Sequence, residues 1–157
     1  MLVVAWNPGE LQKTSLPACH ALFQFFVAED RLSLMMYQRS CDLLLGVPFN
    51  MAEYALLLYL IAREVKLQAH EFIHVLGDAH LYRTHTEAAR EQLEREPYAA
   101  PKLWLDPAVR SVDDAVARYR EILARATRGE APGPLLDGFA KLEKYQYHPP
   151  IKAKMAV

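Results

Sequence analysis

The chain has 157 residues, 52% of them hydrophobic, which is enough for one globular domain with its own core. Its formal net charge is −1, so no overall basic field favours nucleic acid, and an anionic ligand would need a few placed cations. The longest apolar run, 54–62, is far shorter than the roughly 20 residues that a membrane span needs, and the N-terminus lacks the basic region of a signal peptide. We therefore expect a cytoplasmic protein with a single domain over 1–157, without nucleic-acid or membrane partners.

The first predicted elements are strands. Residues 1–5 form a short apolar run that stops at the turn sequence Trp-Asn-Pro-Gly at 6–9. Residues 21–28 and 32–40 are rich in aromatic side chains and methionine, and the charged residues between them suit a tight turn. We predict two antiparallel strands, with Cys19 at the start of this hairpin.

A helix and a further strand follow. Residues 50–66 come after a proline and are apolar on nearly every face, which predicts a buried helix. Over residues 72–82 the period changes to two, which predicts a strand that brings His74, Asp78 and His80 to one surface. The helix over 50–66 is the predicted core helix.

The second half of the chain predicts two more helices. The sequence Thr-His-Thr-Glu from Thr84 has the capping-box pattern, which predicts a helix to about residue 96, where Pro97 closes it. Ser111 should cap a second, amphipathic helix that ends before Gly129.

The remaining elements complete the expected fold. Residues 102–105 suit a short strand, and residues 139–147 lead into a tail over 148–157. Together the elements indicate an α/β (α+β) fold, in which a mixed, largely antiparallel sheet packs against the long buried helix.

Cys19 and Arg39 are the first candidate functional residues. Two cysteines, Cys19 and Cys41, cannot form a disulfide framework, so both should be free thiols in a reducing compartment. The thiolate is the reactive form of cysteine, and a nearby guanidinium stabilises it. Arg39 lies next to apolar runs, where an unpaired charge is costly, so we expect it to meet an anionic ligand. From local sequence alone, Cys19 could also be an ordinary core residue.

Several motifs resemble the C-terminal part of the thymidylate synthase family. They are Ala-Trp-Asn-Pro at 5–8, Leu-Pro-Ala-Cys-His at 16–20, Gln-Arg-Ser-Cys-Asp at 38–42, Leu-Gly-Val-Pro-Phe-Asn at 45–50, Gly-Asp-Ala-His-Leu-Tyr at 77–82 and the terminal residues 148–157. They fall in the family's order, and at its spacing as far as residue 101. The resemblance covers most of the chain and implies a thymidylate synthase-like fold that is truncated at its N-terminus.

The resemblance implies a methyltransferase that converts deoxyuridylate (dUMP) to thymidylate (dTMP), with 5,10-methylenetetrahydrofolate as co-substrate and no metal. Cys19 would add to C6 of the pyrimidine, and the resulting enolate would attack the one-carbon unit. The catalytic residues implied are Cys19, Arg39, Asp42 and Asn50. A deoxyuridylate hydroxymethylase is an alternative within the same family.

The resemblance also implies the binding residues. They are Arg39 and Ser40 for the phosphate, Asn50 for the pyrimidine, His80 and Tyr82 for the sugar hydroxyl, and Asp42, Leu45, Gly46 and Ala156 for the folate. The end of the chain would close over the folate as a lid. An amide at position 50 can donate to a carbonyl and accept from an N–H, which suits uracil. The related cytidylate hydroxymethylases typically have an aspartate there.

Local sequence allows simpler roles for two of these residues. Asn50 could be a helix N-cap, with Glu53 at the capping-box position, and Arg39 could be a solvated strand charge. In an ideal strand Arg39 and Ser40 point to opposite faces. Their joint phosphate role therefore requires an irregular backbone at this point.

One motif belongs to a different class of protein. Residues 70–74 read His-Glu-Phe-Ile-His, a literal match to the His-Glu-x-x-His pattern of zinc proteases. That function requires a helix, on which His70 and His74 share a face with Glu71 as the base. The strand-like alternation here argues against it, so a zinc metalloprotein is the minor alternative.

The resemblance implies partners as well. Thymidylate synthases are homodimers that meet through a sheet face, and two arginines of each subunit reach into the other's phosphate site. The chain begins after the position of these arginines and after the family's N-terminal half, which supplies another arginine, a glutamate and a tryptophan near the folate. We expect a homodimer with slow or absent activity unless a separate N-terminal half complements it. A non-catalytic nucleotide-binding fragment is the alternative.

Overall fold

The computed structural model describes residues 1–129 and 138–155. Contacts divide the chain into two compact units: the first comprises Met1–Glu94 and Ile151–Val157, and the second comprises Arg95–Pro150. The single domain expected from the sequence stays a prediction. No helix in the described residues is long and apolar enough to cross a membrane.

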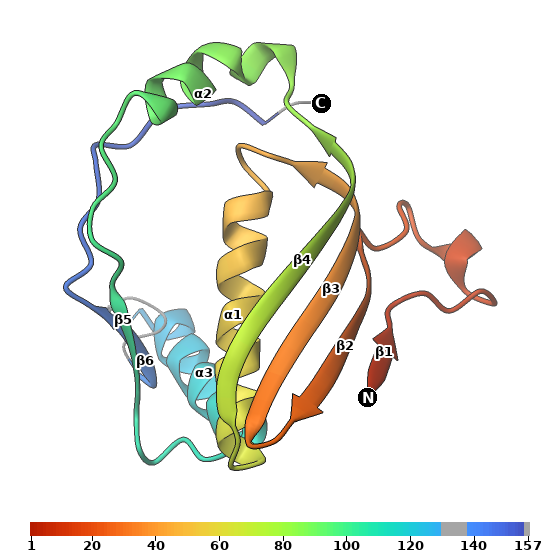
Figure 1. Ribbon diagram of the computed structural model, residues 1–157, viewed down its shortest axis with the longest axis vertical. Helices are drawn as coiled ribbons and strands as arrows, with labels where there is room; N and C mark the ends of the chain where they lie inside the picture. Colours follow the sequence, from red (N-terminus) through yellow and green to blue (C-terminus); the bar gives the residue numbers. More distant parts are fainter. Residues whose placement is uncertain (130–137, 156–157) are drawn as a thin grey trace. The chain divides into compact units, whose positions relative to one another are not determined.

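The first unit is built on a four-stranded sheet (Figure 1). Its elements are β1 (Leu2–Val4), β2 (His20–Ala28), β3 (Arg31–Asp42), α1 (Val47–Glu64) and β4 (Gln68–His80). The sheet order is β1-β2-β3-β4, in which the first three strands are antiparallel and β4 is parallel to β3. A parallel pair needs a crossover, which α1 provides. The predicted mixed, largely antiparallel sheet is confirmed.

The hairpin of β2 and β3 is tight at one end and irregular at the other. Its turn consists of Glu29, which has a φ of 56°, and Asp30. At the far end His20 pairs with Gln38. The next pair is Leu22 with Tyr37, so β2 advances two residues for one of β3. This bulge lies directly after the predicted nucleophile.

Helix α1 packs on one face of the sheet and closes the hydrophobic core (Figure 1). Its residues Tyr54, Leu58 and Ala62 recur at helical spacing, so they share the face that meets the sheet. Leu34 and Met36 of β3 are fully buried beneath them. The buried residues of this core are Phe25, Leu32, Leu34, Met36, Tyr54, Leu58 and Ala62.

Helix α1 begins earlier than predicted and is not buried all round. Gly46 is its N-cap, and Pro48 lies in the first turn. Asn50 is inside the helix and its N–H donates to the carbonyl of Gly46, so the interpretation of Asn50 as the N-cap is wrong. Phe49 is 74% and Tyr59 is 48% exposed, because only one face of α1 meets the sheet.

The chain leaves β4 through a short 3-10 helix, η2 (Arg83–His85), and enters α2 (Thr86–Leu93). The capping box predicted at Thr84 is wrong, since the residue before α2 is His85 and its side chain makes no capping bond. Instead the hydroxyl of Thr86 donates to a carbonyl of η2 at 3.0 Å. Helix α2 also ends before the predicted position.

The second unit pairs β5 (Lys102–Leu105) with β6 (Ala140–Glu143) and carries α3 (Val112–Thr127). The predicted strand and the predicted helix are both confirmed. Ser111 caps α3 by accepting from the N–H of Asp114, whose carboxylate accepts from the Ser111 N–H in return.

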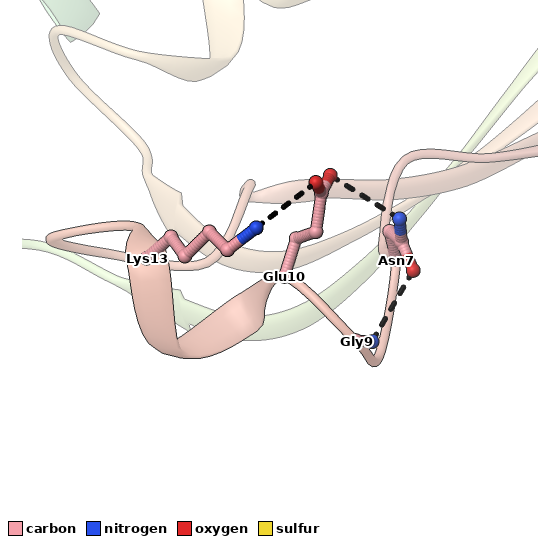
Figure 2. A network of polar contacts seen from close by, with 4 residues as sticks. All are labelled: Asn7, Gly9, Glu10 and Lys13. Carbon is pink, nitrogen blue, oxygen red and sulfur yellow. Dashed lines mark hydrogen bonds and ion pairs between the residues drawn. The ribbon is translucent and has the colours of Figure 1, made fainter.

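The turn after β1 is held by a small polar network (Figure 2). Asn7 accepts from the N–H of Gly9 at 3.2 Å and donates to Glu10 at 3.2 Å. The second carboxylate oxygen of Glu10 pairs at 3.4 Å with Lys13 in the 3-10 helix η1 (Leu11–Lys13). The turn predicted after the first strand is thus confirmed, with side chains that close it locally.

Candidate functional site

Arg39 ties the loop that carries Cys19 to β3. Its backbone N–H donates to the carbonyl of Cys19 at 2.9 Å. Its guanidinium reaches the two preceding carbonyls, with Nε 3.3 Å from Ala18 O and Nη2 2.5 Å from Pro17 O. Trp6 Nε1 donates to the same Ala18 carbonyl at 3.0 Å. Charge-assisted bonds from one cation therefore fix the backbone in front of the thiol.

The same contacts leave Arg39 able to bind an anion. A guanidinium has five N–H donors in a planar fork, and the bonds to the loop use two of them. Arg39 is half-buried and bonded to the loop, so the interpretation as a solvated strand charge is wrong. Its other donors can meet a phosphate near Cys19.

Cys19 is the accessible thiol of the two. Cys41 is fully buried, and its Sγ lies 3.3 Å from the carbonyl of Gln38. Burial raises the pKa of the Cys41 thiol, and the nearby charge of Asp78 raises it further. Cys41 therefore stays a protonated thiol, whereas Cys19 is only half-buried.

The burial pattern of β3 changes where the predicted phosphate ligands lie. From Leu32 to Gln38 every second residue is buried. The next buried residue is Cys41, so the alternation reverses between Gln38 and Cys41. This interval contains Arg39 and Ser40, both half-buried. The pairing of β3 with β4 stays in step from Leu34 to Asp42, so the pairing does not show the irregular backbone that a shared phosphate role for the two residues requires.

Gln38 joins three segments at the site, and sequence reasoning missed it. Its side chain is 3% exposed. Its Nε2 donates to Asn50 Oδ1 at 3.1 Å and to the Ser40 carbonyl at 3.0 Å, and its Oε1 contacts His74 Nε2 at 2.9 Å. The sequence offered one signal, since Gln38 continues the series of alternate residues of β3 that face the core. A polar side chain buried in such a series must find hydrogen-bond partners.

The network fixes which atoms of Asn50 face a ligand. The Ser40 carbonyl can only accept, so the amide nitrogen of Gln38 faces it and Oε1 accepts from His74. Asn50 then presents Oδ1 to Gln38, which leaves its Nδ2 as a donor and a second lone pair of Oδ1 as an acceptor. Burial, with a smaller effect of His20, lowers the pKa of His74, which favours the neutral ring in this network.

Asp42 shapes the corner between β3 and α1. Its Oδ1 accepts from the N–H groups of Leu44 at 3.0 Å and Leu45 at 3.2 Å, and its carbonyl accepts from Gly46 at 3.0 Å. A Cβ on Gly46 would lie 3.1 Å from that carbonyl and 3.7 Å from Asn50 Oδ1. Glycine therefore keeps this corner open beside Asn50, and the turn uses only one oxygen of the Asp42 carboxylate.

His80 and Tyr82 lie at the end of β4, next to this corner. Asp42 pairs with His80 across the two strands, and the Leu43 N–H donates to the His80 carbonyl at 3.0 Å. The rings of His80 and Tyr82 meet edge to face, with centroids 5.0 Å apart. His80 Nδ1 lies 3.4 Å from the carboxylate of Asp78. Tyr82 is 41% exposed, so its side chain is open to a ligand.

The site residues predicted from the sequence are thus joined in one part of the first unit. Arg39 holds the loop of Cys19, and Gln38 links Ser40 with Asn50. Through the Asp42 corner this group continues to His80 and Tyr82 at the end of β4, the pair predicted to bind the sugar. The predicted folate residue Ala156 lies outside the described residues.

The structure contradicts the helix that the zinc alternative requires. The His-Glu-x-x-His pattern lies in β4. His74 bonds to Gln38, whereas His70 lines a hollow on the sheet with Met35 and Ile73. Within residues 1–129 and 138–155, no three His, Cys, Asp or Glu side chains gather closely enough to hold a metal ion.

One comparison with known families adds to this geometry. A family model described as thymidylate synthase matches the chain over residues 1–157. The match spans every segment that contributes to the site, from the loop of Cys19 through the corner at Asp42 to the end of β4.

Proposed function

The chain belongs to the thymidylate synthase family, and from this premise we propose that it converts dUMP to dTMP with 5,10-methylenetetrahydrofolate as co-substrate. One observation carries the proposal: Arg39, a half-buried cation, bonds the backbone that presents the accessible thiol of Cys19. A cation that bonds the loop of an accessible thiol suits an anionic substrate with an electrophilic carbon. A reducing compartment such as the cytoplasm would keep that thiol free.

In the proposed reaction the Cys19 thiolate forms a bond to C6 of the uracil ring. The electron pair of the C5–C6 double bond then moves toward the C4 oxygen and leaves an enolate. Asn50 Nδ2 donates to that oxygen, where negative charge develops, while its Oδ1 accepts from N3–H. C5 then bonds to the methylene group of the folate, whose bond to N10 breaks. When C5 loses its proton to water, the bond from this methylene to N5 breaks and tetrahydrofolate departs. A hydride from tetrahydrofolate reduces the exocyclic methylene as the Cys19 thiolate leaves, which gives dTMP and dihydrofolate.

The same arrangement supports binding roles for the rest of the nucleotide. The unused donors of Arg39 and the hydroxyl of Ser40 are proposed to hold the phosphate, since these two neighbouring residues are both half-buried. His80 and Tyr82 are proposed to bind the sugar hydroxyl. Their rings support each other at the end of β4, which limits the conformational entropy that binding would cost.

The folate is proposed to bind at the corner between β3 and α1. Asp42, Leu45 and Gly46 form this corner, and the carboxylate oxygen that the turn does not use can accept from N–H groups of a pterin. Gly46 leaves room beside Asn50, where the two substrates must meet. Ala156 is proposed to belong to the lid that closes over the folate.

The face of the sheet opposite α1, called the outer face below, supports a homodimer. Phe26, Ile73 and Val75 are 63%, 47% and 40% exposed there. A hollow of about 490 Å³ lies on this face, with Met35 in its lining. An exposed apolar sheet face gains free energy when a second copy covers it. We therefore propose that two copies of the chain meet through this face.

Release of tritium from dUMP labelled at C5 tests the function, because in the proposed reaction C5 loses the label after it has bonded to the one-carbon unit. With methylenetetrahydrofolate present, we expect release that Cys19→Ser abolishes. Cys41→Ala is the matched control and should keep the activity of the parent chain, because this thiol is buried and protonated. Equal release by the parent chain and Cys19→Ser would refute the proposal. Binding of dUMP without release would favour the non-catalytic alternative, and a hydroxymethyl product would favour the hydroxymethylase.

A further inference from the structure

Trp6 makes a hydrogen bond to which the proposed reaction assigns no role. It lies two residues after β1 and is 38% exposed, and its Nε1 donates to the carbonyl of Ala18 at 3.0 Å, 12 residues along the chain. The chain leaves the sheet at Ala5 and returns at Ala21, whose carbonyl accepts from the Ala5 N–H at 2.9 Å. The indole therefore joins the two ends of the loop that carries Cys19.

Two donors hold the carbonyl of Ala18. Arg39 Nε contacts the same oxygen at 3.3 Å, in addition to the indole nitrogen of Trp6. A carbonyl oxygen has two lone pairs, so the two bonds use its whole capacity to accept. Because the peptide unit is planar, the two bonds fix the orientation of the peptide plane that joins Ala18 to Cys19.

The peptide plane on the other side of Cys19 is held as well. The carbonyl of Cys19 accepts from the backbone N–H of Arg39 at 2.9 Å. The two planes that flank a residue are related by its φ and ψ, so fixing both planes also fixes the direction of its Cβ. Only rotation about the Cα–Cβ bond is then left to the thiol. The backbone around the accessible thiol is thus set before a ligand arrives.

The two donors to Ala18 differ in their other roles. The guanidinium of Arg39 is proposed to bind the phosphate, so a ligand draws on the same group that holds the loop. The indole N–H is the one polar group in the side chain of Trp6, and its bond is the shorter of the two. Trp6 can therefore keep the peptide plane in place while Arg39 adjusts to a ligand.

We propose that Trp6 is a positioning residue for Cys19. Its N–H fixes the peptide plane in front of the thiol, and with it the direction from which the thiol meets an electrophilic carbon. The effect on the backbone does not depend on a ligand. The effect on the rate rests on the proposed function, since the orientation of Cys19 matters only for a reaction at its sulfur. Trp6 has no proposed contact with dUMP, so binding should not depend on it.

The backbone amide of Cys19 reports the positioning without turnover, through its order parameter in NMR relaxation. We expect the rigid value of about 0.85 in the parent chain and a fall toward the flexible range, below about 0.6, in Trp6→Phe, which keeps a ring but has no donor. Asn7→Ala is the matched control, because it removes two hydrogen bonds from the same turn without touching Ala18. An unchanged order parameter in Trp6→Phe, or an equal fall in Asn7→Ala, would overturn the proposal.

Tritium release measures the consequence for the reaction. We expect Trp6→Phe to lower kcat roughly threefold to tenfold, the factor that corresponds to one net hydrogen bond, and to leave KM for dUMP within about twofold. An unchanged kcat beside a lower order parameter would overturn the role of Trp6 in the reaction. Absence of release by the parent chain would refute the proposed function instead. In that case the order parameter alone decides whether Trp6 positions Cys19.

A chemical isostere covers the case in which Trp6→Phe does not fold. A tryptophan analogue with sulfur in place of the indole N–H has the shape of tryptophan but no donor. The chain has two tryptophans, so incorporation into the Trp104→Phe chain replaces Trp6 alone. The order parameter of the Cys19 amide should be lower with the analogue than with tryptophan in that chain. Equal order parameters would overturn the proposal.

Discussion

Gln38 Nε2 lies 3.1 Å from Asn50 Oδ1, and this contact decides which side of the Asn50 amide a ligand meets. Gln38 can play this part because its own orientation is fixed by the Ser40 carbonyl and by His74. A residue without an assigned chemical role thus sets the hydrogen-bonding pattern that Asn50 presents to the proposed pyrimidine.

Substitution of Gln38 by glutamate should change the preferred base. A carboxylate only accepts, so the Asn50 amide should turn its Nδ2 toward position 38 and present its oxygen to the ligand. We expect calorimetry to show that the affinity for dUMP falls by about tenfold. The affinity for dCMP, which carries a donor at C4, should rise relative to that for dUMP. The same substitution at the exposed Gln12 is the control. An unchanged ratio of the two affinities would contradict this account of Asn50.

Substitution of Arg39 by alanine should remove the contribution of the phosphate to binding. We expect the affinity for dUMP to fall roughly 10- to 100-fold, as for the loss of a charge-assisted contact. The affinity for deoxyuridine, which has no phosphate, should change much less. Since Arg39 also holds the Cys19 loop, the ratio of the two affinities is the informative quantity. Arg31→Ala, at the other end of β3, is the control. If Arg39→Ala lost the same factor of affinity for dUMP and for deoxyuridine, Arg39 would only hold the loop and would not bind the phosphate.

The stability of the fold should depend on His74 in mildly acidic solution. Burial, and secondarily His20, lowers the pKa of His74 below 6.5, so the unfolded chain binds this proton more readily than the folded one. The contribution of His74 to the free energy of unfolding is therefore complete above pH 6.5 and is lost as the pH falls from 6.5 through the lower folded pKa. His74→Gln, which cannot titrate, should lose less stability over that range in urea unfolding. His70→Gln, at an exposed position of the same strand, should behave as the parent chain does.

Substitution of Phe26 by aspartate should dissociate the proposed homodimer. A charge at the centre of an apolar interface is costly, so we expect the dissociation constant to rise by at least about tenfold in sedimentation equilibrium. Phe49→Asp is the matched control, because Phe49 is 74% exposed on α1, away from the sheet face. A parent chain that sediments as a monomer would rule out the dimer. Equal dissociation by both variants would place the interface elsewhere.

The sequence by itself determined the elements whose signals are local. The aromatic strands with two turn residues between them, the period of two in β4 and the cap at Ser111 all depend on neighbours along the chain, so each could be predicted. The capping box expected at Thr84 failed because that segment continues from β4 as a 3-10 turn before α2 begins. Such a competition between two local structures is decided by packing.

Only the tertiary structure decided how the site residues act on one another. Gln38 meets Asn50 and His74 across 12 and 36 residues, Arg39 reaches Pro17 across 22, and Trp6 reaches Ala18 across 12. Periodicity and propensity report only on neighbours within a turn or a strand, so none of these contacts leaves a mark in a local pattern. The sequence identified the chemical groups, and the crossing of β3, α1 and β4 in space decided which of them meet.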